Sequence, residues 1–219
     1  MKKCIIVANG EKPKKSVLKY FRLKEYEPLI AADGGANNLY RMNIKPDVII
    51  GDFDSIDTTV LYFYKKKSNI KIMHIKRQTD TDVEKCLKYA VKIKCKEVIL
   101  LSATGNRLDH SFCNLGIVLK YFDKIKIRLI HGESILTAYK GEVKLKTIPG
   151  EVISIYGFDH KTKIKSLGLK YPLKNIALPF GKMDSTSNEA TGSEVSLKIS
   201  KGVIFVIRNF DVMRKNGLL

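Results

Sequence analysis

Two aspartates set two residues apart, Asp52 and Asp54, have the type and spacing that most directly suggest chemistry in this sequence. They follow an apolar run at residues 48–50 and then Gly51, within PDVIIGDFDS. Residues two apart at a strand end point the same way, so both carboxylates can face one hard cation or a polyphosphate bound through it. The alternative is a polar turn after a buried strand, because Asp and Ser favour turns.

The first 132 residues alternate short apolar runs with amphipathic segments. In the helix predicted after residue 82, apolar residues recur at helical spacing while Lys85, Lys88 and Lys92 are expected to face water. Such alternation predicts an open, mostly parallel α/β sheet whose ligands bind beyond the carboxyl ends of the strands. The expected strands are 4–8, 29–32, 48–50, 71–75, 98–101 and 126–130, and the first helices are 16–25 and 36–42.

After about residue 131 the pattern changes to short β-rich runs broken by Gly, Pro and Asn. We therefore predict two domains, an α/β domain at residues 1–132 and an all-β sandwich at residues 133–219. Residues 181–192 are expected to form a polar loop. The expected strands of the second domain are 134–139, 142–147, 152–156, 163–169, 194–199 and 203–208.

Composition limits the possible partners and compartment. The 219 residues include 40 Lys and Arg against 22 Asp and Glu, a net charge of +18 that suggests an anionic partner. The lysines are scattered, which favours solvated surface over a nucleic-acid groove, so no nucleic-acid partner is expected. The four cysteines form no CxxC pair and are expected to be buried thiols in a reducing compartment. The first apolar stretch is too short for a signal peptide and nothing resembles a membrane span, so we expect a cytoplasmic protein.

Common nucleotide-binding motifs are missing from the sequence: it has no GxxxxGK[ST], and no GxGxxG follows the first expected strand. Phosphatases of the haloacid-dehalogenase type carry a DxD pair after their first strand. Here the pair follows the third expected strand and Ile56 replaces the expected hydroxyl residue, which argues against this class of phosphatase. The remaining carboxylates are typical of a Mg²⁺–polyphosphate site. They are Asp33, Asp52, Asp54, Asp80, Asp82 and Asp109.

Six short motifs occur in an order that resembles the thiamine pyrophosphokinase family. They are DGGAN at 33–37, GDFDSI at 51–56, TD at 81–82, GNRLDH at 105–110, GLKYPL at 168–173 and STSNE at 185–189. Each motif alone is weak, but six in order over nearly the whole chain are specific. The resemblance implies an ATP- and Mg²⁺-binding α/β domain, a thiamine-binding β-sandwich and a homodimer with thiamine bound between subunits. The implied reaction transfers the terminal diphosphate of ATP to the thiamine hydroxyl, which gives thiamine diphosphate and AMP.

The resemblance and the physics of phosphoryl transfer together suggest site residues. The expected metal ligands, also the catalytic set, are Asp52, Asp54 and Asp82, which would neutralise charge on the transferring group. Thr81 and Glu84 also form a capping box, in which Asp82 merely favours the helix start. The expected ATP contacts are Asp33, Gly34, Gly35, Gln78, Thr81, Arg107 and Asp109.

The role of several residues stays open at this point. Asp109 can orient Arg107 toward phosphate or simply cap a helix, while Asp80 and His110 receive no assigned role. The expected thiamine contacts are Tyr171, which can stack on a cationic ring, and Ser187 and Asn188, which suit an aminopyrimidine; the alternative for the last two is an ordinary loop.

Two other functions use the same residues. A metal-dependent phosphohydrolase would release inorganic phosphate without thiamine, and a non-catalytic nucleotide- or thiamine-binding regulator would bind ligand without forming AMP.

Overall fold

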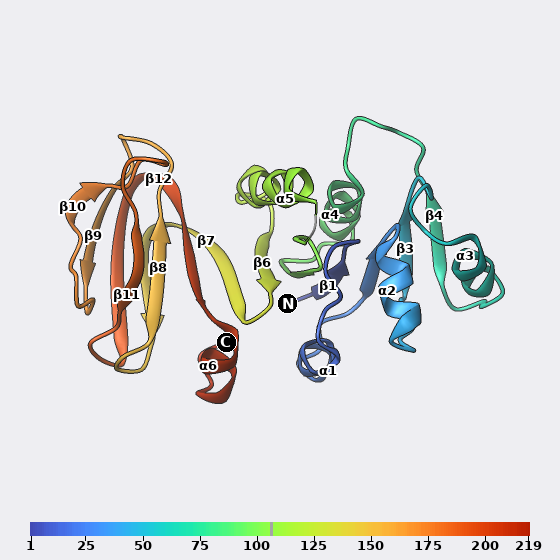
Figure 1. Ribbon diagram of the computed structural model, residues 1–219, viewed down its shortest axis with the longest axis horizontal. Coiled ribbons are helices and arrows are strands. Elements are labelled where there is room, and N and C mark those ends of the chain that lie inside the picture. The colour runs from blue at the N-terminus through green and yellow to red at the C-terminus, as the bar shows by residue number, and fades with distance from the viewer. Residues whose placement is uncertain (106) are drawn as a thin grey trace. The chain divides into compact units, whose positions relative to one another are not determined.

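The computed structural model describes residues 1–105 and 107–219 and divides into two compact units, Met1–Gly132 and Glu133–Leu219. Figure 1 colours the first unit from blue to green and the second from yellow to red. In the N-terminal unit strands and helices alternate. They are β1 (Lys3–Val7), α1 (Lys15–Leu23), β2 (Leu29–Ala32), α2 (Gly35–Arg41), β3 (Val48–Gly51), α3 (Thr58–Lys65), β4 (Lys71–His74), α4 (Asp82–Lys92), β5 (Glu97–Leu101), α5 (Leu108–Lys120) and β6 (Lys126–His131).

The strands of the N-terminal unit form a parallel sheet in the order β6-β5-β1-β2-β3-β4. Every residue of β1 after Lys3 is buried, as are all residues of β2, β3 and β5. Parallel strands covered on both faces show such continuous apolar runs, which is why these strands were readable from the sequence. The predicted open parallel α/β sheet is confirmed.

The strand order reverses at β1, which pairs with β2 on one side and with β5 on the other. The connections that leave β1 and β5 therefore run in opposite directions across the sheet. Such a reversal opens a crevice beyond the carboxyl ends of the strands, where ligands bind in open α/β sheets. The fold thus places the segments after β1, β2, β3 and β5 around one cavity.

Helix α3 was not predicted from the sequence. Its residues, TTVLYFYK, are β-branched or aromatic for the most part and favour strands by propensity. Val60 and Tyr64 nevertheless lie on one helical face and are buried, and the helix packs against α2. Tertiary packing therefore overrides local propensity here.

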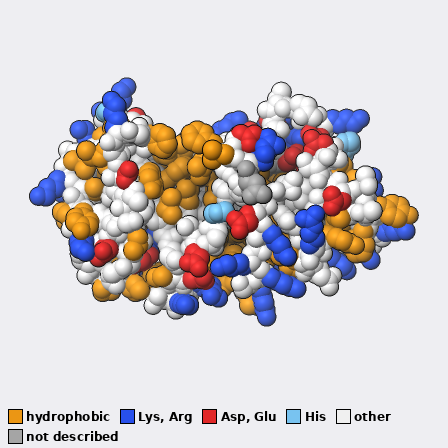
Figure 2. Space-filling model, in the orientation of Figure 1, with side chains coloured by type: hydrophobic (Ala, Val, Ile, Leu, Met, Phe, Trp, Pro, Cys, Tyr) orange, Lys and Arg blue, Asp and Glu red, His pale blue; other side chains and the backbone are white. Residues whose placement is uncertain are grey.

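The C-terminal unit is all-β apart from one short helix at its end. Figure 1 shows its strands in yellow to red, and Figure 2 shows hydrophobic side chains on its visible surface. The elements are β7 (Ser134–Lys146), β8 (Val152–Tyr156), β9 (Lys163–Leu167), β10 (Lys174–Ala177), β11 (Ser185–Glu189), β12 (Glu194–Asn209) and α6 (Phe210–Lys215).

Two long antiparallel strands, β7 and β12, organise the C-terminal unit. The first half of β12 pairs also with β9, which pairs with β10, and its second half pairs with β8, which pairs with β11. Apolar side chains from both halves, such as Leu197 and Val206, belong to one buried cluster with Ile153 and Ile164. The two halves thus enclose one core, as expected of a β-sandwich.

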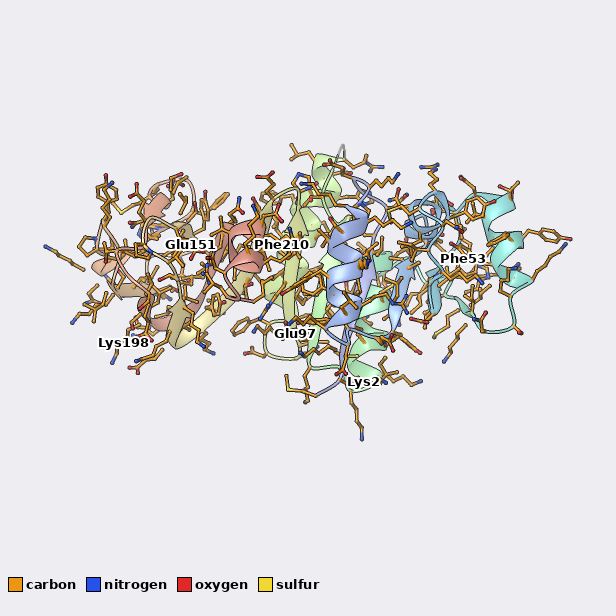
Figure 3. The ribbon with its side chains drawn as sticks, turned by 90° about the horizontal axis from the view of Figure 1, so that it is seen from below. Lys2, Phe53, Glu97, Glu151, Lys198 and Phe210 are labelled. Carbon is orange, nitrogen blue, oxygen red and sulfur yellow. The ribbon has the colours of Figure 1, made fainter. Side chains whose placement is uncertain are left out.

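An ion pair is buried within the C-terminal unit. Arg208 donates to both carboxylate oxygens of Glu151, from Nε at 2.7 Å and from Nη2 at 2.8 Å, and Nη2 also donates to the Lys146 carbonyl oxygen. Glu151 is labelled in Figure 3. A buried charge is tolerated only when it is paired and hydrogen-bonded, as here.

Several strand predictions for this unit were wrong. Residues 134–139 and 142–147 are not two strands but one, β7, and 194–199 and 203–208 are likewise joined in β12. Gly141 has φ +74° and suggested a break, but it stays paired with Ile199, and a register shift after Ile199 absorbs the bend. The predicted polar loop at 181–192 contains β11, a strand stabilised by its pairing with β8 rather than by an apolar pattern. Strand β10 and helix α6 were also missed.

Cysteine burial follows the prediction in part. Cys4, Cys86 and Cys95 are buried free thiols, but Cys113 is exposed on α5, so its predicted burial was wrong. Among the described residues, no helix is long and apolar enough to cross a membrane.

Candidate active site

A cavity of about 640 Å³ lies beyond the carboxyl ends of β1, β2, β3 and β5. All of its lining residues belong to the N-terminal unit. Figure 2 shows acidic and basic side chains close together on the visible face of this unit. Eight of the residues predicted from the sequence line the cavity: Asp33, Gly34, Asp52, Asp54, Gln78, Thr81, Asp82 and Arg107.

Three carboxylates meet in this cavity. Oxygen atoms of Asp33, Asp52 and Asp82 all lie within 4.8 Å of one another. They come from the end of β2, the end of β3 and the start of α4, segments that the parallel sheet brings to one edge. Three carboxylates this close repel one another unless a cation or a proton compensates their charge.

Asp54 lies outside this group of three. The sequence analysis expected Asp52 and Asp54 to point the same way, as in an extended strand, but β3 ends at Gly51 and Phe53 has a left-handed backbone with φ +67°. The two-residue alternation therefore breaks between the two aspartates. The Asp54 carboxylate accepts a hydrogen bond from Ser55 Oγ at 2.8 Å.

Asp33 is the most deeply buried member of the group, with 1% of its surface exposed. Its Oδ2 accepts from the Ser55 backbone N–H at 3.0 Å. Burial first, and then the nearby carboxylates of Asp54 and Asp82, raise the pKa of Asp33 to about 7, although the Ser55 N–H lowers it. Gly51 makes room for this side chain, because a Cβ there would lie 2.6 Å from the Asp33 Cβ.

Lys85 supplies positive charge to the other two carboxylates. Its Nζ lies 2.8 Å from Asp82 Oδ1 and 3.3 Å from Asp52 Oδ2, and 2% of its side chain is exposed. For Asp52, burial raises the pKa but the Lys85 ammonium lowers it, and the net result is a lowered pKa. For Asp82, the effect of burial is larger than that of Lys85, and the pKa is raised. The prediction that Lys85 faces water was therefore wrong. Helical periodicity placed it correctly on α4 but could not reveal carboxylates arriving from β3.

The segment between β4 and α4 is tied to the same group of residues. Gln78 Nε2 donates to Asp52 Oδ2 at 3.0 Å. Asp80 accepts from Lys88 Nζ at 2.6 Å and also pairs with Arg77, and the Lys88 bond lowers the pKa of Asp80. Asp80 thus fastens the segment onto α4.

The predicted capping box at the start of α4 is present only in its first half. Thr81 Oγ1 accepts from the Glu84 N–H at 3.2 Å. The Glu84 carboxylate instead accepts from Tyr121 Oη and Lys120 Nζ.

Arg107 and Asp109 form an exposed pair at the start of α5. Two guanidinium nitrogens of Arg107 donate to the two Asp109 oxygens, which lowers the pKa of Asp109. Of the two roles left open for Asp109, the structure shows contact with Arg107. His110 lines the cavity, whereas Gly35 and Asp109 do not.

Close backbone approach shapes the other side of the cavity. The Gly10 N–H donates to the Ser102 carbonyl oxygen at 2.7 Å, and a Cβ at Gly10 would lie 2.2 Å from the Thr104 oxygen. The sequence analysis did not single out Ser102, Ser111 or Asn114, which also line this side. Ser102 directly follows β5, so its place after an apolar run was the available signal.

The three residues predicted to contact thiamine lie in the C-terminal unit. Tyr171 is 62% exposed, whereas Asn188 is 2% exposed. The Asn188 side chain accepts from the Tyr171 N–H at 3.1 Å and donates to the Tyr171 carbonyl oxygen at 2.7 Å. Asn188 therefore positions Tyr171, and its amide is occupied within the chain. Ser187 is exposed, with a left-handed φ of +53°.

Family models match both units. "Thiamin pyrophosphokinase, catalytic domain" matches residues 22–129, and "Thiamin pyrophosphokinase, vitamin B1 binding domain" matches residues 140–204. The chain belongs to the thiamine pyrophosphokinase family. It is therefore an enzyme of the transferase class, and the resemblance found in its motifs is confirmed.

Individual relatives agree with this assignment. The chain is 30% identical over 193 residues to thiamin pyrophosphokinase 1 of Caenorhabditis elegans, which covers 81% of this chain and 77% of the relative. The crystal structure of thiamine pyrophosphokinase from Bacillus subtilis has 27% identity and a TM-score of 0.80, covering 95% of this chain and 99% of that one. The enzyme from Candida albicans shares the fold, with a TM-score of 0.82, at 20% identity over 95% of this chain and 89% of that one.

Proposed function

We propose that this chain transfers the terminal diphosphate of ATP to the hydroxyl group of thiamine, with Mg²⁺ as cofactor, and forms thiamine diphosphate and AMP. The observation that carries the proposal is the group formed by Asp33, Asp52 and Asp82, which lies within the residues matched by the catalytic-domain model. A nucleotide cavity that gathers carboxylates suits a metal-bound polyphosphate, because free phosphates and carboxylates repel each other.

The residues present fit a hard cation. Within the described part of the chain, Asp33 Oδ1 and Asp52 Oδ1 are buried and have no hydrogen-bond partner. Buried carboxylate oxygens without partners are costly, and both belong to the three-carboxylate group. Mg²⁺ prefers oxygen ligands and, when bound, would neutralise charge on the phosphate oxygens. We assign Asp52 and Asp82 as its ligands and add Asp33 on the basis of geometry. Asp54 lines the cavity but lies outside this group, and we propose it as a ligand on the sequence motif alone.

The other polar residues of the cavity orient ATP in this proposal. Lys85 holds Asp52 and Asp82 in place, and Gln78 restrains Asp52 through its amide. Arg107, already oriented by Asp109, can turn its guanidinium to phosphate oxygens. Thr81 caps α4, and Gly34 lines the cavity after β2, where it allows close backbone approach of the nucleotide. Gly35 contributes through packing, because a Cβ there would lie 2.1 Å from the Val7 backbone oxygen.

Thiamine recognition is assigned to the C-terminal unit, with Tyr171 stacking on the cationic ring and Ser187 beside it. Asn188 contributes by fixing the Tyr171 backbone. We propose a homodimer in which the acidic cavity of one chain and Tyr171 of its partner build each active site. In support, the described lining of the cavity includes no Phe or Tyr, so another surface must supply the aromatic platform. We also propose a cytoplasmic location, without nucleic-acid or membrane partners.

The test is a product assay with ATP, Mg²⁺ and thiamine, analysed by chromatography. AMP and thiamine diphosphate formed in equal amounts support the proposal. Inorganic phosphate released without any need for thiamine would instead indicate a phosphohydrolase. Ligand binding by calorimetry without AMP formation would indicate a non-catalytic regulator. A matched reaction without Mg²⁺, with EDTA present, reports the metal requirement.

A further inference from the structure

The residue between the two aspartates of the β3 end, Phe53, has an unfavourable backbone conformation. Its φ of +67° lies in the left-handed region, which a bulky residue with a Cβ adopts only when its surroundings impose it. The φ of Phe53 decides where Asp54 points, and the Asp52–Phe53 peptide bond links this turn directly to Asp52. Figure 3 labels Phe53 at the end of the N-terminal unit that carries β4 and α3.

His74, the last residue of β4, makes two contacts that fix this conformation. Its ring stacks on the Phe53 ring, with centroids 4.8 Å apart and planes 15° from parallel. Its Nε2 lies 2.9 Å from the Asp52 carbonyl oxygen. Because a carbonyl oxygen only accepts hydrogen bonds, Nε2 carries the proton and donates it. The parallel register pairs His74 with Gly51, so one side chain contacts the peptide before Phe53 and also its ring.

These contacts are not part of the hydrophobic core. His74 is exposed and lies on β4, the edge strand of the sheet. Removing its side chain therefore opens no cavity in the core, although it uncovers the face of the Phe53 ring on which it stacks. The structural effect of removing His74 should therefore be confined to the turn that carries Asp52 and Asp54.

We propose that His74 is a positioning residue for the metal site. Its N–H donor and its ring together hold the Asp52–Phe53 turn left-handed, and this turn aims the Asp52 carboxylate at Asp33 and Asp82. The inference rests on the proposed function, since it assumes that these carboxylates bind the metal ion. His74 acts through Asp52 and Phe53 and does not itself touch substrate or metal.

The two contacts can be separated by substitution. His74→Gln retains a side-chain N–H donor without the ring, and His74→Phe retains a ring without the donor. His74→Ala loses both. Phe53→Gly removes the stacking partner but also the backbone strain, because glycine adopts positive φ freely. His160→Ala, at an exposed histidine of the C-terminal unit, is the matched control.

The experiment measures Mn²⁺ binding to each purified protein, without nucleotide or thiamine, by electron paramagnetic resonance. In parallel, AMP formation is measured against Mg²⁺ concentration at saturating substrates. We expect His74→Ala to raise the Mn²⁺ dissociation constant and the half-saturating Mg²⁺ concentration by about ten-fold, with KM for thiamine unchanged. His74→Gln and His74→Phe should each recover part of the loss. In a Phe53→Gly background, His74→Ala should have a smaller effect than in the wild type.

Asp52→Asn, measured in the same way, separates failure of this inference from failure of the proposed function. If Asp52→Asn loses Mn²⁺ binding while His74→Ala stays within about two-fold of wild type, the inference about His74 is wrong and the metal site stands. If Asp52→Asn binds Mn²⁺ as the wild type does, the metal assignment itself is wrong. A uniform loss in stability, KM for thiamine and Mn²⁺ affinity would show a general structural role for His74 and would also overturn the proposal. Should His74→Ala not fold, the Gln and Phe variants carry the same comparison.

Discussion

The two units of this chain use opposite designs. The central strands of the N-terminal unit, β2, β3 and β5, are short and completely buried, and polar side chains follow directly where strands end. In the C-terminal unit, by contrast, a strand such as β9 alternates exposed and buried residues along its whole length. Its candidate ligand-binding residue, Tyr171, lies on the surface. We infer that the carboxylate chemistry takes place within a cavity of one chain, whereas the exposed Tyr171 ring becomes part of a binding site only when another surface covers it.

The difference extends to the ionic groups. In the N-terminal unit the buried ammonium of Lys85 pairs with two of the three carboxylates, Asp52 and Asp82. Asp33 Oδ1 and Asp52 Oδ1 have no hydrogen-bond partner, which disfavours the unliganded state. In the C-terminal unit Arg208 and Glu151 satisfy each other. We infer that the three-carboxylate group binds a cation, whereas the Arg208–Glu151 pair only stabilises the fold. The following substitutions test this contrast.

The largest effect is expected for Asp52→Asn. This near-isosteric change removes a negative charge from the acidic group and should lower kcat for AMP formation by on the order of a thousand-fold, with the fold intact. Steady-state assays at saturating Mg²⁺, together with a urea unfolding curve, measure both. Asp57→Asn is the control, because Asp57 lies outside the cavity with 52% of its side chain exposed. Near wild-type turnover by Asp52→Asn would remove Asp52 from the site.

Glu151→Ala should have the converse signature, a loss of stability without a direct effect on chemistry. Removing one partner leaves the Arg208 guanidinium buried and unpaired, at a cost of about 3–5 kcal/mol in the free energy of unfolding. Urea denaturation followed by circular dichroism gives this value. Glu142→Ala in the same unit breaks the exposed pair with Lys198 and should change stability little. Equal effects of the two substitutions would mean that burial does not distinguish the pairs.

The raised pKa of Asp33 predicts that the free energy of unfolding changes with pH in the opposite direction to that expected from a carboxylate with a lowered pKa. Because its pKa in the folded chain is raised to about 7, the folded state binds this proton more tightly than the unfolded state does. Without metal, stability from this group should therefore fall as pH rises from about 4 to 7. Asp33→Asn, which cannot ionise, should be more stable than the wild type at pH 8 by on the order of a few kcal/mol, and similar to it near pH 4.

Urea unfolding of both proteins at the two pH values measures this difference. Mg²⁺ at pH 8 should stabilise the wild type more than Asp33→Asn, which lacks one of the proposed ligands. A wild type more stable than Asp33→Asn at pH 8 in EDTA would contradict the assigned pKa shift.

The smallest effect is expected for Tyr171→Ala. Stacking on a cationic ring contributes about 1–2 kcal/mol, so thiamine affinity should fall on the order of ten-fold while ATP affinity stays unchanged. Calorimetry with each ligand separates the two. Tyr62→Ala is the matched control, because the Tyr62 side chain is 61% exposed and, like Tyr171, has a lysine over its ring. Equal losses for both ligands would argue against a specific role of Tyr171.

The sequence predicts the N-terminal unit better than the C-terminal unit for a physical reason. A strand buried on both faces is a continuous apolar run, and its end is marked by a glycine at its last position, as at Gly51, or by an aspartate directly after it, as at Asp33. The C-terminal strands are long and bent, and β7 passes through Gly141 without interruption because its partner stays paired there. Pairing between distant segments decides such cases, and a local pattern does not record it.

Site residues show the same limit. Asp33 and Asp52 could be picked out because each follows an apolar run, but their meeting with Asp82 depends on strand order. Lys85 was expected in water, since only the folded sheet brings Asp52 over α4. Asn188 was expected to offer its amide to a ligand, yet the antiparallel neighbour Tyr171 uses it.

Subunit mixing tests the division of labour between the two units most directly. Asp52→Asn and Tyr171→Ala chains are unfolded together in equal amounts and refolded. They are assayed at subsaturating thiamine, where a ten-fold loss of affinity leaves the Tyr171→Ala homodimer about a tenth of wild-type activity. If each site combines the acidic cavity of one chain with Tyr171 of its partner, a heterodimer contains one site with both lesions and one with none. Random pairing should then restore roughly a quarter of wild-type activity. Activity no higher than the sum of the two separate variants, or a monomer by light scattering, would contradict the account.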